Sequence, residues 1–166
     1  SELVTLCFNR SFFRDNGVAV STARAGNVIG GGDFAANRII PDCVRAAERR
    51  EKILVRNPNS VRPYQHVLEA LFAYMMIIKA QYNEIEMANS YNIGPDESDC
   101  ITTENLVKLF CEFWGDDLKS TTNEEIGPHE ASFLRLDSSR IKQTLGWKPR
   151  WRIEEAVERT VRWTKA

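Results

Sequence analysis

Segments with the patterns of strands and of helices alternate along this chain of 166 residues, and the alternation restricts its fold more than any other feature. The runs typical of strands cover residues 18–25, 52–56, 61–66, 90–93, 118–122 and 133–136. The helical patterns cover residues 38–50, 67–82, 103–114, 138–145 and 153–165. Strands and helices that alternate in this way predict an α/β fold.

Residues 1–13 have the pattern of an amphipathic helix with one broad apolar side. The large apolar residues of that side are Leu3, Leu6, Phe8, Phe12 and Phe13. A side of this kind usually needs a partner surface to cover it. The chain opens without Met and has no signal-peptide pattern. We therefore expect that a further part of the protein precedes Ser1.

The helix expected at residues 67–82 is apolar on most of its sides. Residues 70–78 form the longest apolar run of the chain, and this run is too short to span a bilayer. A helix that is apolar all round is usually buried. The pattern therefore predicts that this helix lies deep inside the fold.

The charge of the chain is nearly balanced, with 22 Lys and Arg against 23 Asp and Glu and a formal net charge of −1. This balance gives no electrostatic reason for a nucleic acid or an anionic membrane as partner. The four cysteines lie far apart and form no Cys-x-x-Cys pair, a usage that favours a reducing compartment. We expect a cytoplasmic protein that binds neither nucleic acid nor membrane.

Familiar signatures of catalytic and metal sites are missing from the sequence. Neither of its two histidines, His66 and His129, has a His or Cys at the spacing of metal ligands, so no metal site is predicted. The sequence contains no Walker loop, no Gly-x-Ser-x-Gly elbow and no His-Glu-x-x-His. These patterns predict no complete active site.

A glycine-rich segment at residues 24–33 is the strongest local signal. It follows a strand and leads toward a helix, where exposed backbone amides can face an anion. Its Gly30-x-Gly32-x-x-Ala35 spacing fits a relaxed dinucleotide fingerprint, but Arg56 and Asn57 stand where that fingerprint needs an acidic residue. We favour a loop that contacts substrate. The alternative is a purely structural loop that needs glycine for tight turns.

Arg62 lies on an expected strand beside the rigid Pro63, just before the long helix. A guanidinium held in this way can grip a phosphate or a carboxylate with two hydrogen bonds. From spacing alone, an ion pair with a neighbouring Asp or Glu is the alternative. Tyr64 and His66 are interpreted as packing residues with satisfied polar tips.

Several motifs, taken in order, resemble the extended short-chain dehydrogenase/reductases that act on nucleotide sugars. They are Ala23-Arg24-Ala25-Gly26-Asn27-Val28-Ile29-Gly30-Gly31-Gly32-Asp33-Phe34, Ile39-Ile40-Pro41-Asp42, Arg56-Asn57-Pro58, Arg62-Pro63-Tyr64-Gln65-His66-Val67-Leu68-Glu69, Tyr91-Asn92-Ile93-Gly94-Pro95, His129-Glu130-Ala131, and Leu145-Gly146-Trp147-Lys148-Pro149 followed by Trp163. The resemblance covers essentially the whole chain. It implies that residues 1–35 are the last part of an NAD-binding Rossmann half. Residues 36–166 would be a smaller, mixed α/β substrate-binding domain interleaved with it.

Within that family the chain resembles the 4,6-dehydratases, with CDP-glucose as the implied substrate and NAD as the implied cofactor. In the implied reaction NAD⁺ takes a hydride from C4 of the sugar, water leaves across C5 and C6, and the hydride returns to C6. The family's catalytic Tyr-x-x-x-Lys and its NAD glycine loop would both precede Ser1, so residues 1–166 alone are expected to be inactive. The alternatives are an epimerase or reductase acting on another nucleotide sugar, and a binding module without catalysis.

The residues that the resemblance implies as substrate contacts are Asn27, Arg38, Arg62, Asn92, His129 and Glu130. Asn27, Arg62 and Asn92 correspond to positions near the sugar diphosphate, and Arg38 to the start of a helix that lines the nucleotide pocket. Gly26 corresponds to a position near the nicotinamide, and no catalytic residue is implied within this chain. The full-length protein is expected to be a homo-oligomer.

Overall fold

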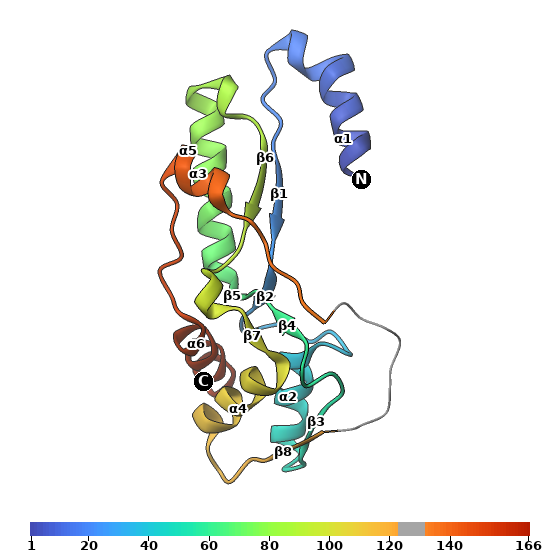
Figure 1. Cartoon of the computed structure of the whole chain (residues 1–166), viewed down its shortest axis with the longest axis vertical. Coiled ribbons are helices and arrows are strands. Elements are labelled where there is room, and N and C mark those ends of the chain that lie inside the picture. Colours follow the sequence, from blue (N-terminus) through green and yellow to red (C-terminus); the bar gives the residue numbers. More distant parts are fainter. Residues whose placement is uncertain (123–131) are drawn as a thin grey trace.

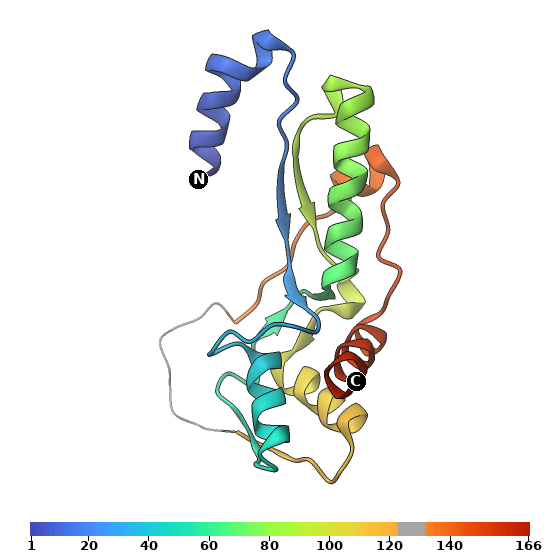
Figure 2. The ribbon, with the colours of Figure 1, turned by 180° about the vertical axis from the view of Figure 1, so that it is seen from behind.

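The structure, a computed structural model, describes residues 1–122 and 132–166. Most of its strand pairs are parallel and helices connect them, which confirms the α/β fold. The chain is drawn out along one axis, with two groups of packed elements that follow each other along it (Figures 1 and 2). We call the lower group in Figure 1 the body and the upper group the arm.

The helices of the body are α2 (Ile39–Glu48), α4 (Thr103–Trp114) and α6 (Ile153–Lys165). The short strands between them are β2 (Asn27–Ile29), β3 (Ile53–Val55), β4 (Val61–Arg62), β5 (Tyr64–His66), β7 (Ile101–Thr102) and β8 (Ser120–Thr122). β2 pairs with β5 and β3 with β8 in parallel, and β4 pairs with β7 antiparallel. Apolar side chains at helical spacing, such as Leu106 and Phe110 of α4, join the three helices in one buried cluster.

The arm consists of the parallel strands β1 (Thr22–Ala25) and β6 (Ser90–Ile93), the long helix α3 (Val67–Asn83) and the short helix α5 (Ser139–Leu145). The residues of its separate buried cluster are Ala73, Ile77, Tyr91, Ile93, Ile141 and Trp147. The Tyr91 hydroxyl donates to the carbonyl oxygen of Met87 (2.6 Å). The arm thus has a core of its own, smaller than that of the body.

Helix α1 (Glu2–Phe8) and the π-helical turn after it (Asn9–Phe13) stand beside the arm, and none of their residues is buried (Figures 1 and 2). An ion pair between Arg24 of β1 and Glu2 connects the two. The amphipathic pattern of residues 1–13 is therefore helical as predicted, with its apolar side exposed.

Gly26 is the residue at which the chain passes from the arm to the body. Its N–H donates to the carbonyl oxygen of Ile93 in β6 (2.9 Å), and the next N–H, that of Asn27, donates to the carbonyl oxygen of Pro63 (3.0 Å). Strand β1 therefore pairs within the arm, and β2 pairs within the body. A Cβ at residue 26 would lie 2.5 Å from the Pro63 oxygen, so this crossing requires glycine.

The prediction that the long helix lies deep inside the fold is wrong. The exposed large apolar residues of α3 are Leu68, Leu71, Phe72, Met75, Ile78 and Tyr82. Strands β1 and β6 and helix α5 lie against one side of α3, where Ala73 and Ile77 are buried, and no described element covers the other side. Burial depends on the neighbours that are present, and an apolar sequence alone does not supply them.

The observed strands differ from the predicted ones at residues 27–29, 61–66 and 133–136, and the runs predicted at 18–25, 52–56 and 118–122 form the shorter strands β1, β3 and β8. The run at residues 61–66 is divided into β4 and β5 because Pro63 has no N–H for a ladder. Asn27–Ile29, expected as part of the glycine-rich loop, forms strand β2. At residues 133–136 the structure has only a single bridge, between Phe133 and Val61.

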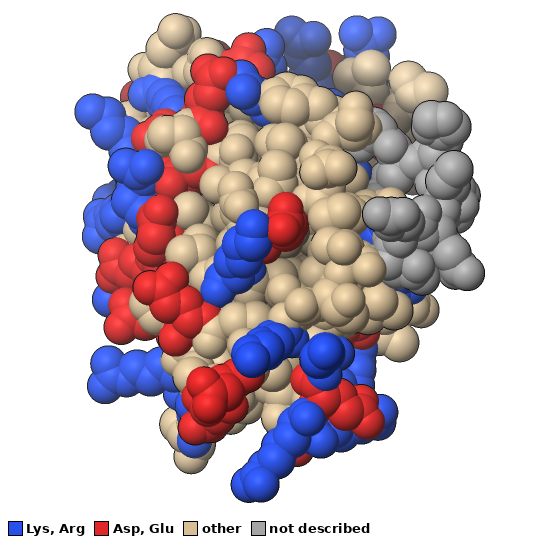
Figure 3. All heavy atoms as spheres, turned by 60° about the horizontal axis from the view of Figure 1, so that its bottom comes forward, with Lys and Arg blue, Asp and Glu red and all other residues tan. Residues whose placement is uncertain are grey.

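On the underside of the body, charged side chains of both signs alternate around an area of other residues (Figure 3). Some of the charged groups of the body helices are paired one helical turn apart, as in Lys108–Glu104 (2.8 Å) and Arg159–Glu155 (2.7 Å). This mixture agrees with the balanced net charge. Within residues 1–122 and 132–166, no helix combines the length and the apolar character needed to cross a membrane.

Candidate functional site

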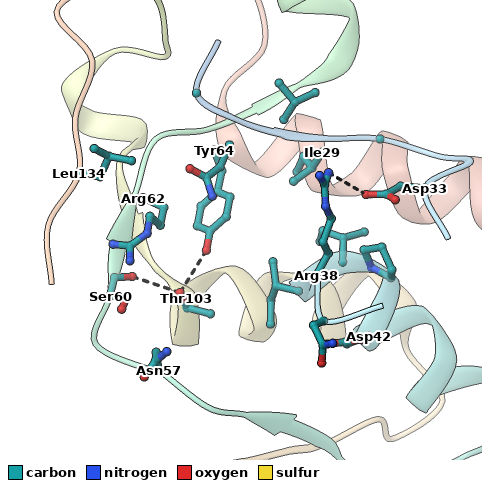
Figure 4. Close-up of a pocket in the computed structure, with 18 of the residues that line it drawn as sticks. Ile29, Asp33, Arg38, Asp42, Asn57, Ser60, Arg62, Tyr64, Thr103 and Leu134 are labelled. Atoms are coloured by element: carbon teal, nitrogen blue, oxygen red, sulfur yellow. Dashed lines mark hydrogen bonds and ion pairs between the residues drawn. The ribbon is translucent and has the colours of Figure 1, made fainter. Parts of the chain in front are cut away.

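A cavity of about 1140 Å³ opens in the body, next to the crossing at Gly26 (Figure 4). Its walls come from residues 25–38, the start of α2, the ends of β3 and β4, and the start of α4. We call this cavity the pocket. Small-molecule sites typically have volumes of roughly 300–1,000 Å³, so the pocket has room for an extended ligand.

Strands β4 and β5 form one wall of the pocket. Ser60, Arg62 and Tyr64 all line it, because side chains two positions apart point to the same side of an extended chain. The Tyr64 hydroxyl lies 3.1 Å from Oγ1 of Thr103. Thr103 Oγ1 in turn donates to the carbonyl oxygen of Ser60 (3.2 Å). These hydrogen bonds fix the start of α4 against the wall (Figure 4).

Arg62 is embedded in this wall and only 6% exposed. Its Nη1 donates to the carbonyl oxygen of Val61 (2.9 Å), and its backbone pairs with Ile101 of β7. A guanidinium that is held by its own strand loses little freedom when it binds an anion. Burial also strengthens its electrostatic interactions. Arg62 therefore gives the wall a fixed positive charge.

The opposite wall is formed by Arg38 and by residues 30–37, which we call the glycine loop. Arg38 occupies the N-cap position of α2, and its side chain is 67% exposed. Its Nη1 lies 3.5 Å from Oδ2 of Asp33, whose Oδ1 accepts from the N–H of Ala35 (3.0 Å). Figure 4 shows Arg38 and Arg62 on opposite sides of the pocket. One wall thus has a fixed guanidinium and the other a movable one.

A network of charges ties the far end of the glycine loop to α2 and β3. Asp42 of α2 binds both Arg45 and Arg56. Arg45 also donates to the carbonyl oxygen of Phe34 (3.3 Å). Arg56, which stands where a dinucleotide fingerprint needs an acid, donates to Oδ1 of Asn37 (3.1 Å). Arg56, which does not fit the dinucleotide fingerprint, therefore stabilises the glycine loop.

The predicted contact residues Gly26, Asn27, Arg38 and Arg62 all line the pocket. Asn92 lies elsewhere, in β6, and is not among the described lining residues. Its Oδ1 accepts from Nη1 of Arg24 (3.0 Å), and its Nδ2 donates to the carbonyl oxygen of Asp137 (3.1 Å). His129 and Glu130 lie outside the described residues.

Sequence reasoning missed part of the lining, namely Leu54, Asn57, Ser60, Thr103, Leu134 and Leu136. Tyr64 is a buried residue of the body cluster and its hydroxyl meets Thr103, which confirms the prediction of a packing residue with a satisfied polar tip, and it also lines the pocket. The alternation of positions 60, 62 and 64 could have revealed Ser60 and Tyr64 once Arg62 was chosen. Thr103 lies at the pocket because β7, which directly precedes it, pairs with β4. The sequence contains no local signal for this pairing.

The glycines of the loop are explained by contacts within the protein. A Cβ at Gly30 would lie 2.7 Å from Cγ1 of Val67, and a Cβ at Gly31 would overlap the indole of Trp163. Gly32 has a φ of +79°, which residues with side chains rarely adopt. Packing and turn geometry account for all three glycines. None of the three therefore needs a bound dinucleotide to explain it.

Two titratable groups near the pocket have shifted pKa values. Burial and the positive charge of Arg159 lower the pKa of His66, whose Nδ1 accepts from the N–H of Leu68 (3.2 Å). Burial likewise raises the pKa of the Cys43 thiol well above its usual range. His66 therefore caps α3 as a neutral imidazole, and Cys43 is a core residue of the body. Within the described residues, no cluster of His, Cys, Asp or Glu suits a metal ion.

The sequence matches the GDP-mannose 4,6 dehydratase family over residues 7–160. It is 42% identical over 172 residues to the CDP-glucose 4,6-dehydratase of Salmonella typhimurium (strain LT2), an alignment that covers 100% of this chain and 48% of that protein. The chain thus spans about half the length of this relative.

The fold is similar to that of UDP-glucose 4-epimerase from Thermotoga maritima with UDP-glucose, with a TM-score of 0.80 at 22% identity. It is also similar to dTDP-glucose 4,6-dehydratase from Bacillus anthracis in complex with NAD, with a TM-score of 0.73 at 19% identity. Both alignments cover 99% of this chain, and they cover 50% and 49% of those chains. These likenesses establish the fold.

Proposed function

The chain belongs to the GDP-mannose 4,6-dehydratase family, and from this membership we propose that it is the nucleotide-sugar-binding part of a 4,6-dehydratase. The proposed reaction converts CDP-glucose to CDP-4-keto-6-deoxyglucose. The identity of 42% to the Salmonella CDP-glucose 4,6-dehydratase supports this choice of substrate. The observation that carries the proposal is a pocket of about 1140 Å³ with a guanidinium on each of two opposite walls.

A sugar diphosphate is the anion that suits this pocket best. Its two linked phosphate groups present oxygen acceptors on opposite sides, so Arg62 and Arg38 can bind it from both walls. Buried Arg62 acts as the fixed anchor. Exposed Arg38 can exchange Asp33 for a phosphate oxygen, since its ion pair with that carboxylate is long. The exposed carboxamide of Asn27, which lines the pocket beside Gly26, supplies a further hydrogen-bonding group.

The rest of the ligand has apolar surface to pack on. Leu54, Leu134 and Leu136 line the pocket and offer contact to the faces of a base or a sugar ring. We propose His129 and Glu130 as nucleotide contacts on the basis of the motif that contains them. Asn92 is proposed as a phosphate contact on the same basis, which requires its amide to leave Arg24 or Asp137.

NAD is proposed as the cofactor because the similar dTDP-glucose 4,6-dehydratase of Bacillus anthracis was solved with NAD. Since packing and turn geometry explain the glycines of residues 30–32, the roles proposed for residues 1–166 are to bind and orient the substrate. The sequence also contains no Tyr-x-x-x-Lys, the pair that the resemblance assigns to catalysis. We propose that residues 1–166 on their own do not turn over the substrate.

The proposal divides the chain into residues 1–35, which belong with an NAD-binding Rossmann half, and residues 36–166, which bind the nucleotide sugar. The parallel pairing of β1 with β6 supports an interleaved arrangement, because β6 comes from the second segment. We further propose that the full protein is a cytoplasmic homo-oligomer. The unpaired cysteines and the exposed apolar side of α1 support this proposal.

An epimerase that acts on another nucleotide sugar is the second candidate. The likeness to UDP-glucose 4-epimerase from Thermotoga maritima favours it, since the fold is equally compatible with that chemistry. The two candidates differ in product. A dehydratase releases water and leaves a lighter nucleotide sugar, whereas an epimerase leaves an isomer of the same mass.

Calorimetric titration of the full gene product tests the proposal, with CDP-glucose, dTDP-glucose, UDP-glucose and NAD⁺ as titrants. We expect saturable binding of CDP-glucose in preference to the other two sugars. After incubation with CDP-glucose and NAD⁺, mass spectrometry should detect a product that is lighter than the substrate by one water. Preference for UDP-glucose with an isomeric product would replace the dehydratase by the epimerase, and binding of no nucleotide sugar would contradict both.

A further inference from the structure

Trp163, in the last turn of α6, lies directly on the glycine loop. A Cβ at Gly31 would overlap its indole ring, and a Cβ at Gly32 would lie 3.5 Å from its Cη2 atom. The indole is nevertheless 58% exposed, so it is a poor contributor to the buried core. The flat face of the indole packs on the backbone of Gly31 and Gly32, which have no side chains.

The glycine loop has two sides with different neighbours. Gly30 and Asp33 line the pocket on one side. On the other side, Gly30, Gly32 and Asp33 line a small cavity of about 70 Å³, together with Trp163. The indole therefore stands behind the pocket wall that faces Arg62. It reaches no ligand in the pocket except through this loop.

We infer that Trp163 is a positioning residue, which holds the backbone of Gly30 to Gly32 from behind and so sets where Asp33 and Arg38 stand in the pocket. The inference rests on the proposed function for the identity of the ligand. It adds a residue from the opposite end of the chain, on a helix that does not line the pocket.

The composition of the loop makes such a support necessary. Three consecutive glycines have more backbone freedom than any other sequence of that length. Arg45 fixes the loop only from Phe34 onward. A rigid indole, which loses little entropy on packing, limits the freedom of the glycines at the near end. The glycines are in turn what allows the ring to approach so closely.

The first test compares CDP-glucose binding by the full gene product carrying Trp163→Ala, Trp163→Phe or Arg162→Ala. We expect Trp163→Ala to raise the Kd, and the KM of turnover, by about tenfold with little change in kcat, since a displaced anion-binding wall weakens binding. Phe retains a flat ring and should restore most of the affinity. Arg162 is exposed on the same helical turn and lines neither cavity, so Arg162→Ala should behave as wild type.

The second test uses Gly31, which has no positive φ, so that alanine is allowed there apart from the overlap with the indole. Gly31→Ala should weaken CDP-glucose binding about as much as Trp163→Ala. In the double variant the Cβ has space, so the two effects should not add. Fully additive effects would overturn the inference, because they would mean that the two residues act separately.

A third readout needs no ligand. Trypsin cleaves after Arg38, which follows the glycine loop, and cleavage after Arg14 serves as an internal reference. Trp163→Ala should accelerate cleavage after Arg38 alone. Unchanged cleavage in that variant overturns the inference whatever the ligand is. If wild-type protein binds no nucleotide sugar, the proposed function fails, and the cleavage rates still decide the role of Trp163.

Discussion

The body and the arm both contain helices with apolar sides but bury those sides differently. In the body, the apolar sides of α2, α4 and α6 meet in one cluster. In the arm, α3 is more uniformly apolar than any of these helices, yet only one of its sides is buried. An apolar pattern therefore shows which sides of a helix can be buried. Which sides are buried depends on the elements that pack against the helix.

The comparison also explains where the pocket lies. Its walls are built from elements of the body, where paired strands and a closed core fix the backbone. Among the described residues, the arm contributes to the pocket at the crossing around Gly26, through Ala25 at the end of β1. Fixed side chains such as Arg62 are therefore expected in the body.

The sharpest test of the comparison replaces one isoleucine in each region. Ile53 of the body is 1% exposed and Ile77 of the arm is 4% exposed. Within the roughly 2–5 kcal/mol range for this change, we expect Ile53→Ala to cost about 4 kcal/mol and Ile77→Ala about 2. Alanine favours the helix at residue 77, and β-branched side chains favour the strand at residue 53. Urea denaturation measures both, and equal losses would show that the arm is packed as tightly as the body.

Arginines provide the next comparison. Arg62→Ala should weaken CDP-glucose binding by about 1.5–3 kcal/mol, because a charge-assisted hydrogen bond to the diphosphate is lost. Arg140 of the arm donates to Oδ1 of Asn89 at the surface (2.6 Å), and Arg140→Ala should leave the affinity unchanged. Calorimetry measures the affinity of both variants for CDP-glucose, and their thermal midpoints show whether they are folded. An unchanged affinity of a folded Arg62→Ala variant would make Arg62 a purely structural residue.

A side chain at Gly26, where the chain passes from the arm to the body, tests how tightly this crossing is packed. Gly26→Ala should destabilise the protein by about 1–3 kcal/mol, because the new Cβ meets the Pro63 carbonyl oxygen and separates arm from body. Gly17→Ala is the matched control, since Gly17 has a positive φ but open space around it. We expect a smaller loss there, of about 1 kcal/mol, from backbone conformation alone. A larger loss at residue 17 than at residue 26 would remove the steric argument.

Protonation probes the cap where β5 of the body leads into α3 of the arm. Because the pKa of His66 is lowered in the folded protein, the unfolded chain takes up a proton first as the pH falls through the ordinary value of 6.5. The contribution of neutral His66 is therefore complete above that pH and is lost progressively below it. His66→Asn can still cap α3 and should flatten this part of the pH–stability curve. Thermal midpoints of both proteins, measured from above to below pH 6.5, test this. If the midpoint of His66→Asn still falls with pH as in wild type, other groups cause the fall.

The smallest expected effect concerns the exposed side of α3. Met75→Gln should change the unfolding free energy by less than about 0.5 kcal/mol, since Met75 has few neighbours to lose. It should also reduce self-association, which sedimentation measures, because exposed apolar surface is adhesive. Ala73→Gln, on the buried side of the same helix, should be clearly destabilising. Similar stabilities of the two variants would contradict the one-sided burial of α3.

Elements with local signals were predictable from the sequence. Helix α4 has the predicted bounds because Thr102 caps its start, with Oγ1 accepting from the N–H of Asn105 (3.2 Å), and Gly115 follows its end. Strand β6 and helix α6 likewise have the predicted bounds. In each case the residues that decide the element lie within it or next to it.

Features that depend on distant residues were not predictable. The burial of α3 depends on which elements lie beside it, and the place of Thr103 in the pocket depends on strand pairing. The fit of Trp163 to Gly31 joins positions at opposite ends of the chain. The glycine run predicted a loop that contacts substrate or makes tight turns, and only the structure shows that the indole of Trp163 packs on it.

The exchange of partners at Gly26 has a consequence for hydrogen exchange. The N–H of Gly26 is bonded to Ile93 of the arm, and the N–H of Asn27 to Pro63 next to β5 of the body. An amide exchanges with deuterium when its own region opens, so these neighbours report on two different opening reactions. The exchange rates of these two consecutive amides should therefore differ by the full difference in opening free energy between the arm and the body.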